Sequence, residues 1–354
     1  MRVAAPQFIA ALKRKAMTNR RAVLLAPLAG LAPWPLFAQT PKAGIGLNIS
    51  NAAGTLTPTR AAIALRAAAQ SVIWIGAEAG IFKKHGVDVK LTLDTGGPRA
   101  AAGTIGGDWE FCHTGDTPVV QGVLKGQDPV LIVGVTEPHD IAFLMARRNI
   151  TKPEQLAGAR IGGVDAKGQF GKYVDGLLAK WGVTANVLTL GSFKNVYAAL
   201  EKGEIDAGYL PVDLRFIGEK EFGWNNLAGI PIGAGGIVTT RRQIASNPDL
   251  VSRFVKASVE TIAMFKTRPD QAVPLLQSFL QISDRKAVET LHAYYVPLFR
   301  AIPRPTFEAD LPGLKTTFAR EFPAVANLRS EDLCDASFVN ELERTGYING
   351  LYKS

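Results

Sequence analysis

The stretch SVIWIGAEAGIFKKHGVDVKLTLDT, residues 71–95, decides the fold because it predicts a helix, a stop and a strand in succession. Ser71 can cap the helix, and apolar residues at helical spacing follow it as far as Phe82. Gly86 is expected to end the helix in the left-handed conformation. From Val87 to Asp94 apolar and polar residues alternate, which predicts an edge strand with one buried face in a helix-covered sheet.

The same pattern returns in LLAKWGVTANVLTLGS, residues 177–192. Gly86 and Gly182 lie 96 positions apart, and so do Gly107 and Gly203, which each precede a short apolar strand. Together with the matching residues around them, this spacing predicts two related α/β lobes. The alternative is that any two βαβ units share these features.

The rest of the chain is consistent with two lobes and a helical tail. Residues 61–68 are a candidate first strand, and the solid apolar run 130–135 predicts a central parallel strand. The chain is expected to cross into the second lobe near residues 137–140 and to return at residues 233–239, with an exit loop at 209–213. The predicted domains are a signal peptide over 1–38, the first lobe over 39–138 and 235–354, and the second lobe over 139–234.

The composition is typical of a soluble globular protein, with 47% hydrophobic and 20% charged residues among 354. A net charge of +9 at first suggests nucleic acid as a partner. However, residues 1–38 hold six Lys and Arg and no acidic residue, which leaves 34 basic against 31 acidic residues elsewhere. A nucleic-acid partner is therefore not expected.

The segment 1–38 has the pattern of a secretory signal. Its basic part ends at Arg20 and Arg21, an apolar stretch follows, and small residues near Ala38 offer a cleavage point. We expect a periplasmic protein, with the Sec or Tat route and a start at Met1 or Met17 left open. The two cysteines, Cys112 and Cys334, could form one disulfide or remain two thiols.

Five motifs carry a resemblance to a known family: AEAGIFKKHGVDVKL (77–91), TGGPR (95–99), DWEFCHTGD (108–116), KPEQLAGARIG (152–162) and LEKGEIDAGYL (200–210). With them the chain resembles the periplasmic substrate-binding proteins of ABC importers in the nitrate/sulfonate/taurine group, also called NMT1/THI5-like. The resemblance implies a two-lobed type II periplasmic binding protein fold. Each lobe would be a five-stranded α/β sheet flanked by helices, with the ligand cleft between the lobes and a helical C-terminal region.

The resemblance also implies a function. A small organic ligand, of sulfonate or carboxylate type, would be captured by closure of the lobes and delivered to an ABC permease and its ATPase. The protein would be a monomer that is peripheral to the membrane and needs no cofactor or metal.

Candidate ligand-binding residues follow from a physical rule, since ligands of open α/β sheets bind beyond the carboxyl ends of strands, at helix N-termini. These candidates are Gln70, Ser71, Gly97, Arg99, Thr114, Gly115, Asp116, Thr117, His139, Lys167, Gly168, Gln169, Phe170, Ser192, Phe193, Tyr209 and Asp213.

Each group of candidates also has an explanation that involves no ligand. Arg99 and Lys167 are the predicted charge partners of an anion, or else solvated surface cations. The hydroxyl residues are equally explained as helix caps, and the aromatic residues as core. Asp116 does not suit a simple inorganic anion, but it could cap its helix or bind an amine or hydroxyl group. These features favour an organic ligand over nitrate.

Catalysis is the runner-up hypothesis. His113 with Asp116, or His139 with Asp140, could act as acid–base pairs, although neither spacing is diagnostic. The sequence has no phosphate-binding loop, nucleophile elbow or dinucleotide motif. Pyrimidine-precursor synthases, which look to need a cysteine-rich motif that is missing here, and aromatic-acid decarboxylases remain the enzymatic alternatives. A periplasmic sensor subunit is the third hypothesis.

Overall fold

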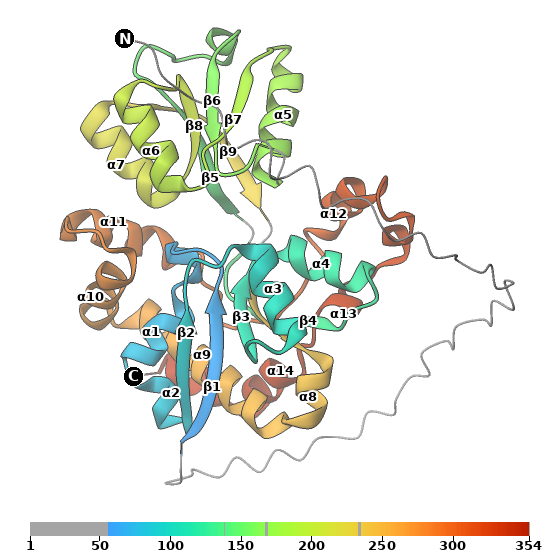
Figure 1. Cartoon of the computed structure of the whole chain (residues 1–354). Helices are drawn as coiled ribbons and strands as arrows, with labels where there is room; N and C mark the ends of the chain where they lie inside the picture. Colours follow the sequence, from blue (N-terminus) through green and yellow to red (C-terminus); the bar gives the residue numbers. More distant parts are fainter. Residues whose placement is uncertain (1–55, 138, 167–168, 233–234, 354) are drawn as a thin grey trace, which may run out of the picture. The chain divides into compact units, whose positions relative to one another are not determined.

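The computed structural model describes residues 56–353 except 138, 167–168 and 233–234; the side chains of 139–141, 169–170 and 230–232 are also left undescribed. The described chain forms two five-stranded mixed sheets flanked by helices (Figure 1). The first sheet has the order β2-β1-β3-β10-β4, from β1 (Thr57–Ile63), β2 (Val87–Thr92), β3 (Phe111–Thr114), β4 (Pro129–Gly134) and β10 (Gly236–Thr240). The second has the order β7-β6-β8-β5-β9, from β5 (His139–Ala146), β6 (Arg160–Gly163), β7 (Asn186–Thr189), β8 (Ala207–Pro211) and β9 (Asn225–Ile232).

The two sheets have equivalent topology. In each, three parallel strands are followed across the sheet by one antiparallel strand, which is β10 in the first and β5 in the second. Gly86 and Gly182, and likewise Gly107 and Gly203, adopt positive φ at matching points. The predicted fold class is therefore confirmed. The boundaries of the two lobes as separate domains stay a prediction.

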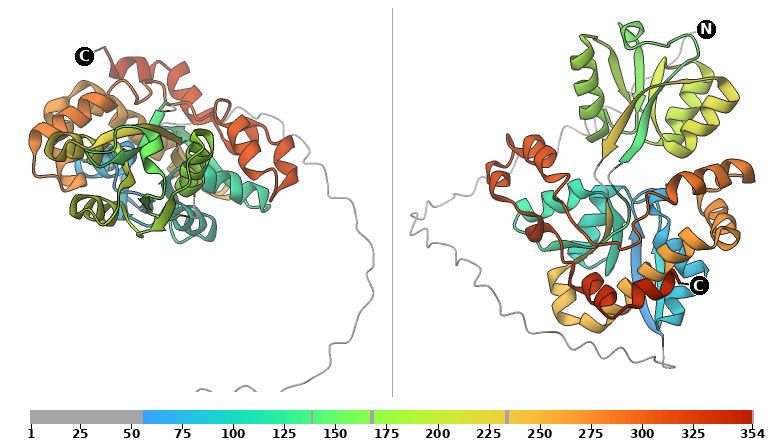
Figure 2. Two further views of the ribbon diagram at one scale, coloured as in Figure 1. Left: turned by 90° about the horizontal axis from the view of Figure 1, so that it is seen from above. Right: turned by 180° about the vertical axis from the view of Figure 1, so that it is seen from behind.

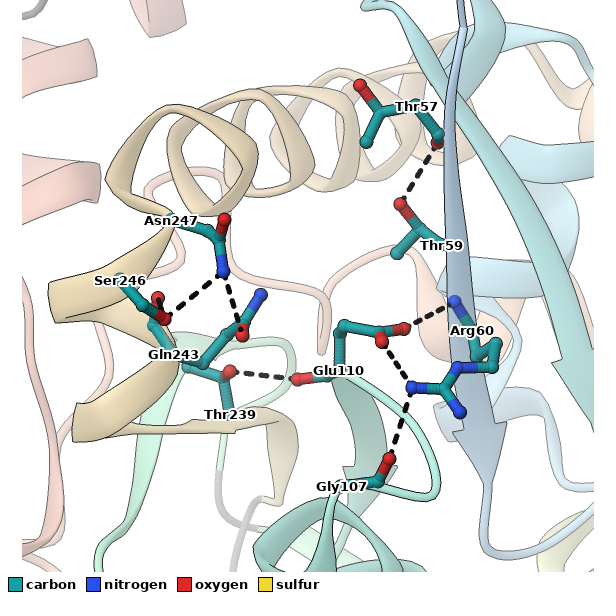
Figure 3. Close-up of polar contacts among 9 residues, drawn as sticks. All are labelled: Thr57, Thr59, Arg60, Gly107, Glu110, Thr239, Gln243, Ser246 and Asn247. Atoms are coloured by element: carbon teal, nitrogen blue, oxygen red, sulfur yellow. Dashed lines mark hydrogen bonds and ion pairs between the residues drawn. The ribbon is translucent and has the colours of Figure 1, made fainter.

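A polar clamp at the amino end of β3 supports the first sheet (Figure 3). The Glu110 carboxylate accepts hydrogen bonds from the Arg60 backbone N–H at 2.7 Å and from its guanidinium at 2.5 Å. The same guanidinium donates to the Gly107 carbonyl at 3.1 Å. Thr239 of β10 donates to the Glu110 carbonyl at 2.8 Å, so the clamp joins three strands.

The second sheet repeats this clamp with different residues. The Asp206 carboxylate accepts from the Arg160 backbone N–H at 2.9 Å and from its guanidinium at 3.3 Å. The guanidinium also donates to the Gly203 carbonyl at 3.2 Å. The 96-residue spacing in the sequence thus corresponds to a repeated structural unit, in which glycine at positive φ presents its carbonyl to an arginine.

The helices fall into three groups along the chain. Those of the first sheet are α1 (Val72–Glu78), α2 (Ile81–Lys84), α3 (Gly97–Gly106) and α4 (Asp116–Leu124), preceded by the 3₁₀ turn η1 (Ala68–Gln70). Those of the second are α5 (Gln169–Trp181), α6 (Phe193–Lys202) and α7 (Val212–Phe222), with η2 (Pro153–Leu156). The C-terminal region adds α8 (Arg241–Ser246), α9 (Pro248–Thr267), α10 (Pro269–Leu280), α11 (Arg285–Tyr295), α12 (Leu311–Phe318), η3 (Pro323–Asn327), α13 (Ser330–Leu333), α14 (Ser337–Arg344) and α15 (Tyr347–Leu351).

Helix α9 is the central core element of the first sheet. Its Phe254 stacks on Phe111 of β3 at 3.8 Å between ring centroids and contacts Phe82 at 4.7 Å. All three rings are fully buried. The C-terminal helices α14 and α15 pack against α9 (Figure 2), which fixes the end of the chain to this core. Within the described residues, no helix combines the length and the apolar character needed to span a bilayer.

In the stretch 71–95, the predicted glycine at positive φ and the predicted edge strand are confirmed, but the predicted helix is partly wrong. The helix is broken between α1 and α2, because Gly80 adopts the left-handed conformation at φ 73°. Ser71 makes no capping bond and instead donates its hydroxyl to the Ala68 carbonyl at 2.8 Å. Gly86 has φ 72°, and β2 is the edge strand with alternating burial that the sequence predicts.

The prediction of a central strand at 130–135 is also wrong. Strand β4 lies at the edge of its sheet and pairs with the antiparallel β10 alone among the named strands. All six of its residues are nevertheless buried. The C-terminal region covers it, through an isolated bridge between Leu131 and Cys334 and through the contacts of α9, α13 and α14. A solid apolar run therefore reflects covering by helices here, and not a central position.

Smaller differences have local causes. The first strand occupies 57–63, and the alanine-rich residues 68–70 form the η1 turn, in line with the low strand preference of alanine. Residues 209–213 are no loop, because β8 runs into α7 without a break. Cys112 and Cys334 are both free thiols.

Candidate functional site

The carboxyl edges of the two sheets are the candidate ligand-binding edges, because helices begin there. In the first sheet η1 with α1, α3 and α4 follow β1, β2 and β3, and in the second α5, α6 and α7 follow β6, β7 and β8. Free backbone N–H groups and the positive end of the helix dipole suit such positions to anions. Most of the sequence-predicted residues lie at these turns.

Asp116 is the most unusual residue at the carboxyl edge of the first sheet. It is the first residue of α4, follows the N-cap Gly115, and is only 3% exposed. Its Oδ1 accepts a hydrogen bond from the backbone N–H of Gly235 at 3.1 Å. Its Oδ2 is buried and receives no hydrogen bond from an N–H or hydroxyl group of the described residues. A buried acceptor of this kind lowers the stability of the folded protein unless a hydrogen-bond donor reaches it.

Further charged groups act on the Asp116 carboxyl. Burial raises its pKa well above the usual carboxyl range, and the negative charge of Asp310 raises it further. The N–H of Gly235 and the positive charge of Arg300 oppose this rise. Burial, and then the charges of Asp310 and Asp116, also raise the pKa of Tyr173 on α5. The two carboxyls therefore lie in one electrostatic environment, where both ionise together only with difficulty.

Arg300 belongs to a segment that crosses the carboxyl end of β4. Three backbone hydrogen bonds of 2.8 to 3.0 Å join residues 298–303 to residues 134–137. The Arg300 guanidinium pairs with Glu137 at 3.1 Å and donates to the Arg304 carbonyl at 2.8 Å, while its Nε is buried without a partner among the described residues. Two of the three guanidinium nitrogens of Arg300 are thus directed at protein acceptors.

Arg99 does not lie with these groups. Its guanidinium pairs with Asp108 at 3.0 Å and lies over the Trp109 ring at 5.3 Å, and its side chain is 63% exposed. Asp108 and Trp109 follow the C-terminal end of α3, so Arg99 extends along its helix toward that end. The geometry agrees with a surface ion pair.

Three other candidates of the first sheet have structural partners. Gln70 Oε1 accepts from the Leu65 N–H at 2.9 Å, and the Ser71 hydroxyl is used within η1. The Thr114 hydroxyl donates to the Gly97 carbonyl at 3.5 Å and so links the turns after β3 and β2. Thr117, in the first turn of α4, is half-buried.

In the second sheet, three candidates also have structural roles. Ser192 caps α6 by accepting the Asn195 N–H at 3.2 Å. Tyr209 is fully buried and packs edge-on against Phe193 at 6.4 Å. Its hydroxyl exchanges hydrogen bonds with the backbone of Asp165 at 3.1 and 3.2 Å. This contact holds the backbone of Asp165, which follows β6.

Asp213 lies in the first turn of α7 and is half-buried. Burial raises its pKa to about 6, against the N–H groups of Leu214 and of Asp213 itself, which lower it. Its charge also contributes, after burial, to the raised pKa of Tyr295 on α11. A carboxyl whose pKa is raised by burial at a helix N-terminus is a candidate for a functional group.

The side chains of the remaining candidates lie outside the described part of the structure. Lys167 and Gly168 lie outside the described residues. Gln169 and Phe170 begin α5 and His139 begins β5, but their side chains are undescribed. Among the described residues, no group of three or more His, Cys, Asp or Glu is arranged to hold a metal ion.

Asp310, Arg300 and Tyr173 are the residues that sequence reasoning missed. Asp310 and Arg300 come from the C-terminal region, which the sequence pattern assigned to packing helices. One signal could have identified this segment, because four prolines between 297 and 312 interrupt helix formation while charged residues remain between them.

Comparison with known proteins identifies the architecture. A family described as NMT1/THI5 like matches residues 69–272. No curated protein matches the sequence. Three solved structures share the fold over most of their length. The alkanesulfonate-binding protein SsuA from Xanthomonas axonopodis pv. citri, bound to MOPS, is 16% identical with a TM-score of 0.61, covering 77% of this chain and 95% of its own.

The aliphatic sulphonate binding protein SsuA from Escherichia coli is 15% identical with a TM-score of 0.60, covering 79% of this chain and 99% of its own. The nitrate-binding protein NrtA from Synechocystis PCC 6803 is 10% identical with a TM-score of 0.64, covering 82% and 89%. At these identities the likeness establishes a shared fold, that of type II periplasmic binding proteins.

Proposed function

Because this chain belongs to the NMT1/THI5-like family, we propose that it is the solute-binding protein of an ABC importer. It captures a small organic molecule outside the cytoplasm and delivers it to a permease and its ATPase, with no covalent chemistry. The ligand carries an anionic group of sulfonate or carboxylate type. The segment 1–38, which lies outside the described residues, serves as its export signal.

One observation supports this function most strongly. Two sheets of equivalent topology each begin several helices at their carboxyl edge, so each sheet offers a set of helix N-termini. Helix N-termini favour anions without a dedicated cation. This matters because Arg99 is engaged by Asp108 and Trp109. Lys167 remains the proposed charge partner from the second lobe, and the lobes close on the ligand by a hinge motion.

A thermal-shift screen of the purified chain tests the proposal. The panel contains sulfonates, aromatic carboxylates, nitrate, amino acids and pyrimidines. A ligand at about 100 times its dissociation constant should stabilise the protein by about 2.7 kcal/mol, which is a shift of several degrees. The expected result is a hit that is recovered chemically unchanged. A hit that is converted would indicate an enzyme, and silence across the panel would contradict small-molecule capture.

A further inference from the structure

Asp116 and Asp310 form a pair of carboxyl groups in direct contact. The side chain of Asp116, in the first turn of α4, is hydrogen-bonded to that of Asp310, the residue directly before α12. Asp116 Oδ2 is buried and receives no hydrogen bond from an N–H or hydroxyl group of the described residues. Two ionised carboxylates offer only acceptor atoms, so a hydrogen bond between them requires a proton on one of them. The intact pair therefore shares one proton.

The surroundings of the pair favour this proton. Asp116 is only 3% exposed, and burial raises its pKa before the negative charge of Asp310 raises it further. The positive charge of Arg300 acts in the opposite direction, but the Arg300 guanidinium is also paired with Glu137 at 3.1 Å. Tyr173 of α5 interacts with both aspartates and is a neutral phenol, since burial and then their charges raise its pKa. These groups compensate one negative charge on the pair more readily than two.

The pair joins chain segments that are far apart in the sequence. Asp116 Oδ1 accepts a hydrogen bond from the Gly235 N–H at 3.1 Å, directly before β10. Gly235 has φ 51°, and a Cβ at this position would lie 2.8 Å from the carbonyl oxygen of Thr114, so its backbone packs closely on the end of β3. Asp310 connects this point to the segment before α12, where Phe307 is fully buried in a core shared with β3 and α4.

We propose that the Asp116–Asp310 pair is a proton-dependent clasp, which holds the starts of α4 and β10 and the segment before α12 together only while it carries its proton. When the proton is released to water, the hydrogen bond between the carboxyls is lost and their charges repel each other. The Gly235 N–H then loses its fixed acceptor. These contacts lie at the carboxyl edge of the first sheet, which is a candidate ligand-binding edge. The rigidity of that edge thus depends on the pH around the protein, a property beyond the proposed function.

Infrared difference spectroscopy of the full chain tests whether the proton is present. At pH 6 the wild type should show the C=O stretch of a protonated carboxyl, which titration to pH 9 should remove. Asp116→Asn should lack this band at both pH values, so the difference between the two proteins isolates the pair. The matched control is Glu308→Gln, which removes an exposed carboxylate from the segment that carries Asp310 and should keep the band. A wild type without the band at pH 6 would overturn the inference, whether or not the variants fold.

Hydrogen exchange tests the clasp itself, with protection factors that are already corrected for the intrinsic effect of pH. The protection of the Gly235 N–H should fall by about tenfold or more between pH 6 and pH 9 in the wild type and in Glu308→Gln, since one unit of pKa corresponds to a factor of ten. In Asp116→Asn it should stay constant, because the amide oxygen still accepts from Gly235 and the amide N–H donates to Asp310 at every pH.

Two results of this exchange experiment would contradict the clasp. One is protection of the Gly235 N–H that does not change with pH in the wild type, and the other is an equal change in Asp116→Asn. Either result would overturn the inference and leave the proposed function standing, because no ligand takes part in these measurements.

Discussion

His113 makes a specific contribution to the pH dependence of stability. This residue lies on β3, is 2% exposed, and its Nδ1 has no hydrogen-bond partner among the described residues. Burial lowers its pKa to about 3, against about 6.5 in the unfolded chain. Because the unfolded state binds the proton more readily, the free energy of unfolding falls as pH decreases from 6.5 toward 3. Between pH 8 and pH 5 the loss is about 2 kcal/mol, at about 1.4 kcal/mol per pH unit below 6.5.

The test compares the wild type with His113→Gln, which has no titrating ring. Urea unfolding of both proteins at pH 8 and pH 5 gives four free energies. The wild type should lose about 2 kcal/mol more than the variant over this interval. Titration of His292, whose pKa burial also lowers, is common to both proteins and cancels in the difference. An equal loss in both proteins would refute the reasoning, since the folded state would then accept the His113 proton at no cost.

Three substitutions test the packing of the second sheet and the N-cap of one of its helices. In Gly163→Ala the new Cβ would lie 2.1 Å from the Tyr209 ring. Urea unfolding should therefore show this variant to be destabilised by about 1 to 3 kcal/mol. The control, Gly176→Ala, places its Cβ in open space on α5 and should be neutral or slightly stabilised. Equal stabilities of these two variants would contradict the packing described here. Ser192→Ala removes the hydrogen bond to the Asn195 N–H and should cost about 1 kcal/mol, measured in the same way; an unchanged midpoint would show that the cap is not needed.

Local features of the sequence predicted the elements well where one residue decides the backbone. Gly86 and Gly182 end their helices at positive φ, and the alternating residues 87–92 form an edge strand. These predictions succeeded because glycine conformation and strand alternation depend on immediate neighbours. The break at Gly80 was missed because the apolar spacing continues across it.

Long-range contacts determine the features that the sequence did not predict. The apolar run of β4 suggested a central strand, but its burial comes from helices more than 100 residues further along the chain. The predicted start of a helix identified Asp116 as a candidate. It could not identify Asp310 or Arg300, because long-range contacts bring them close. Arg300 is held there by backbone hydrogen bonds between residues 298–303 and 134–137, and Asp310 follows further along the same C-terminal segment. No short pattern encodes such a contact, although the prolines of the segment exclude a regular helix there.

The position of β10 between β3 and β4 has a consequence for the order of folding. Strands β3 and β4 end at residues 114 and 134, yet the strand that joins them begins only at residue 236. During synthesis the facing edges of β3 and β4 therefore stay unpaired until the whole second sheet has been made, and its five strands are contiguous within 139–232. We expect the second sheet to form first and the insertion of β10 to be the slow step, because it closes the longest loop in the first sheet. Until then two unpaired edges are open to association with other chains, which is the stage at which a chaperone would matter most.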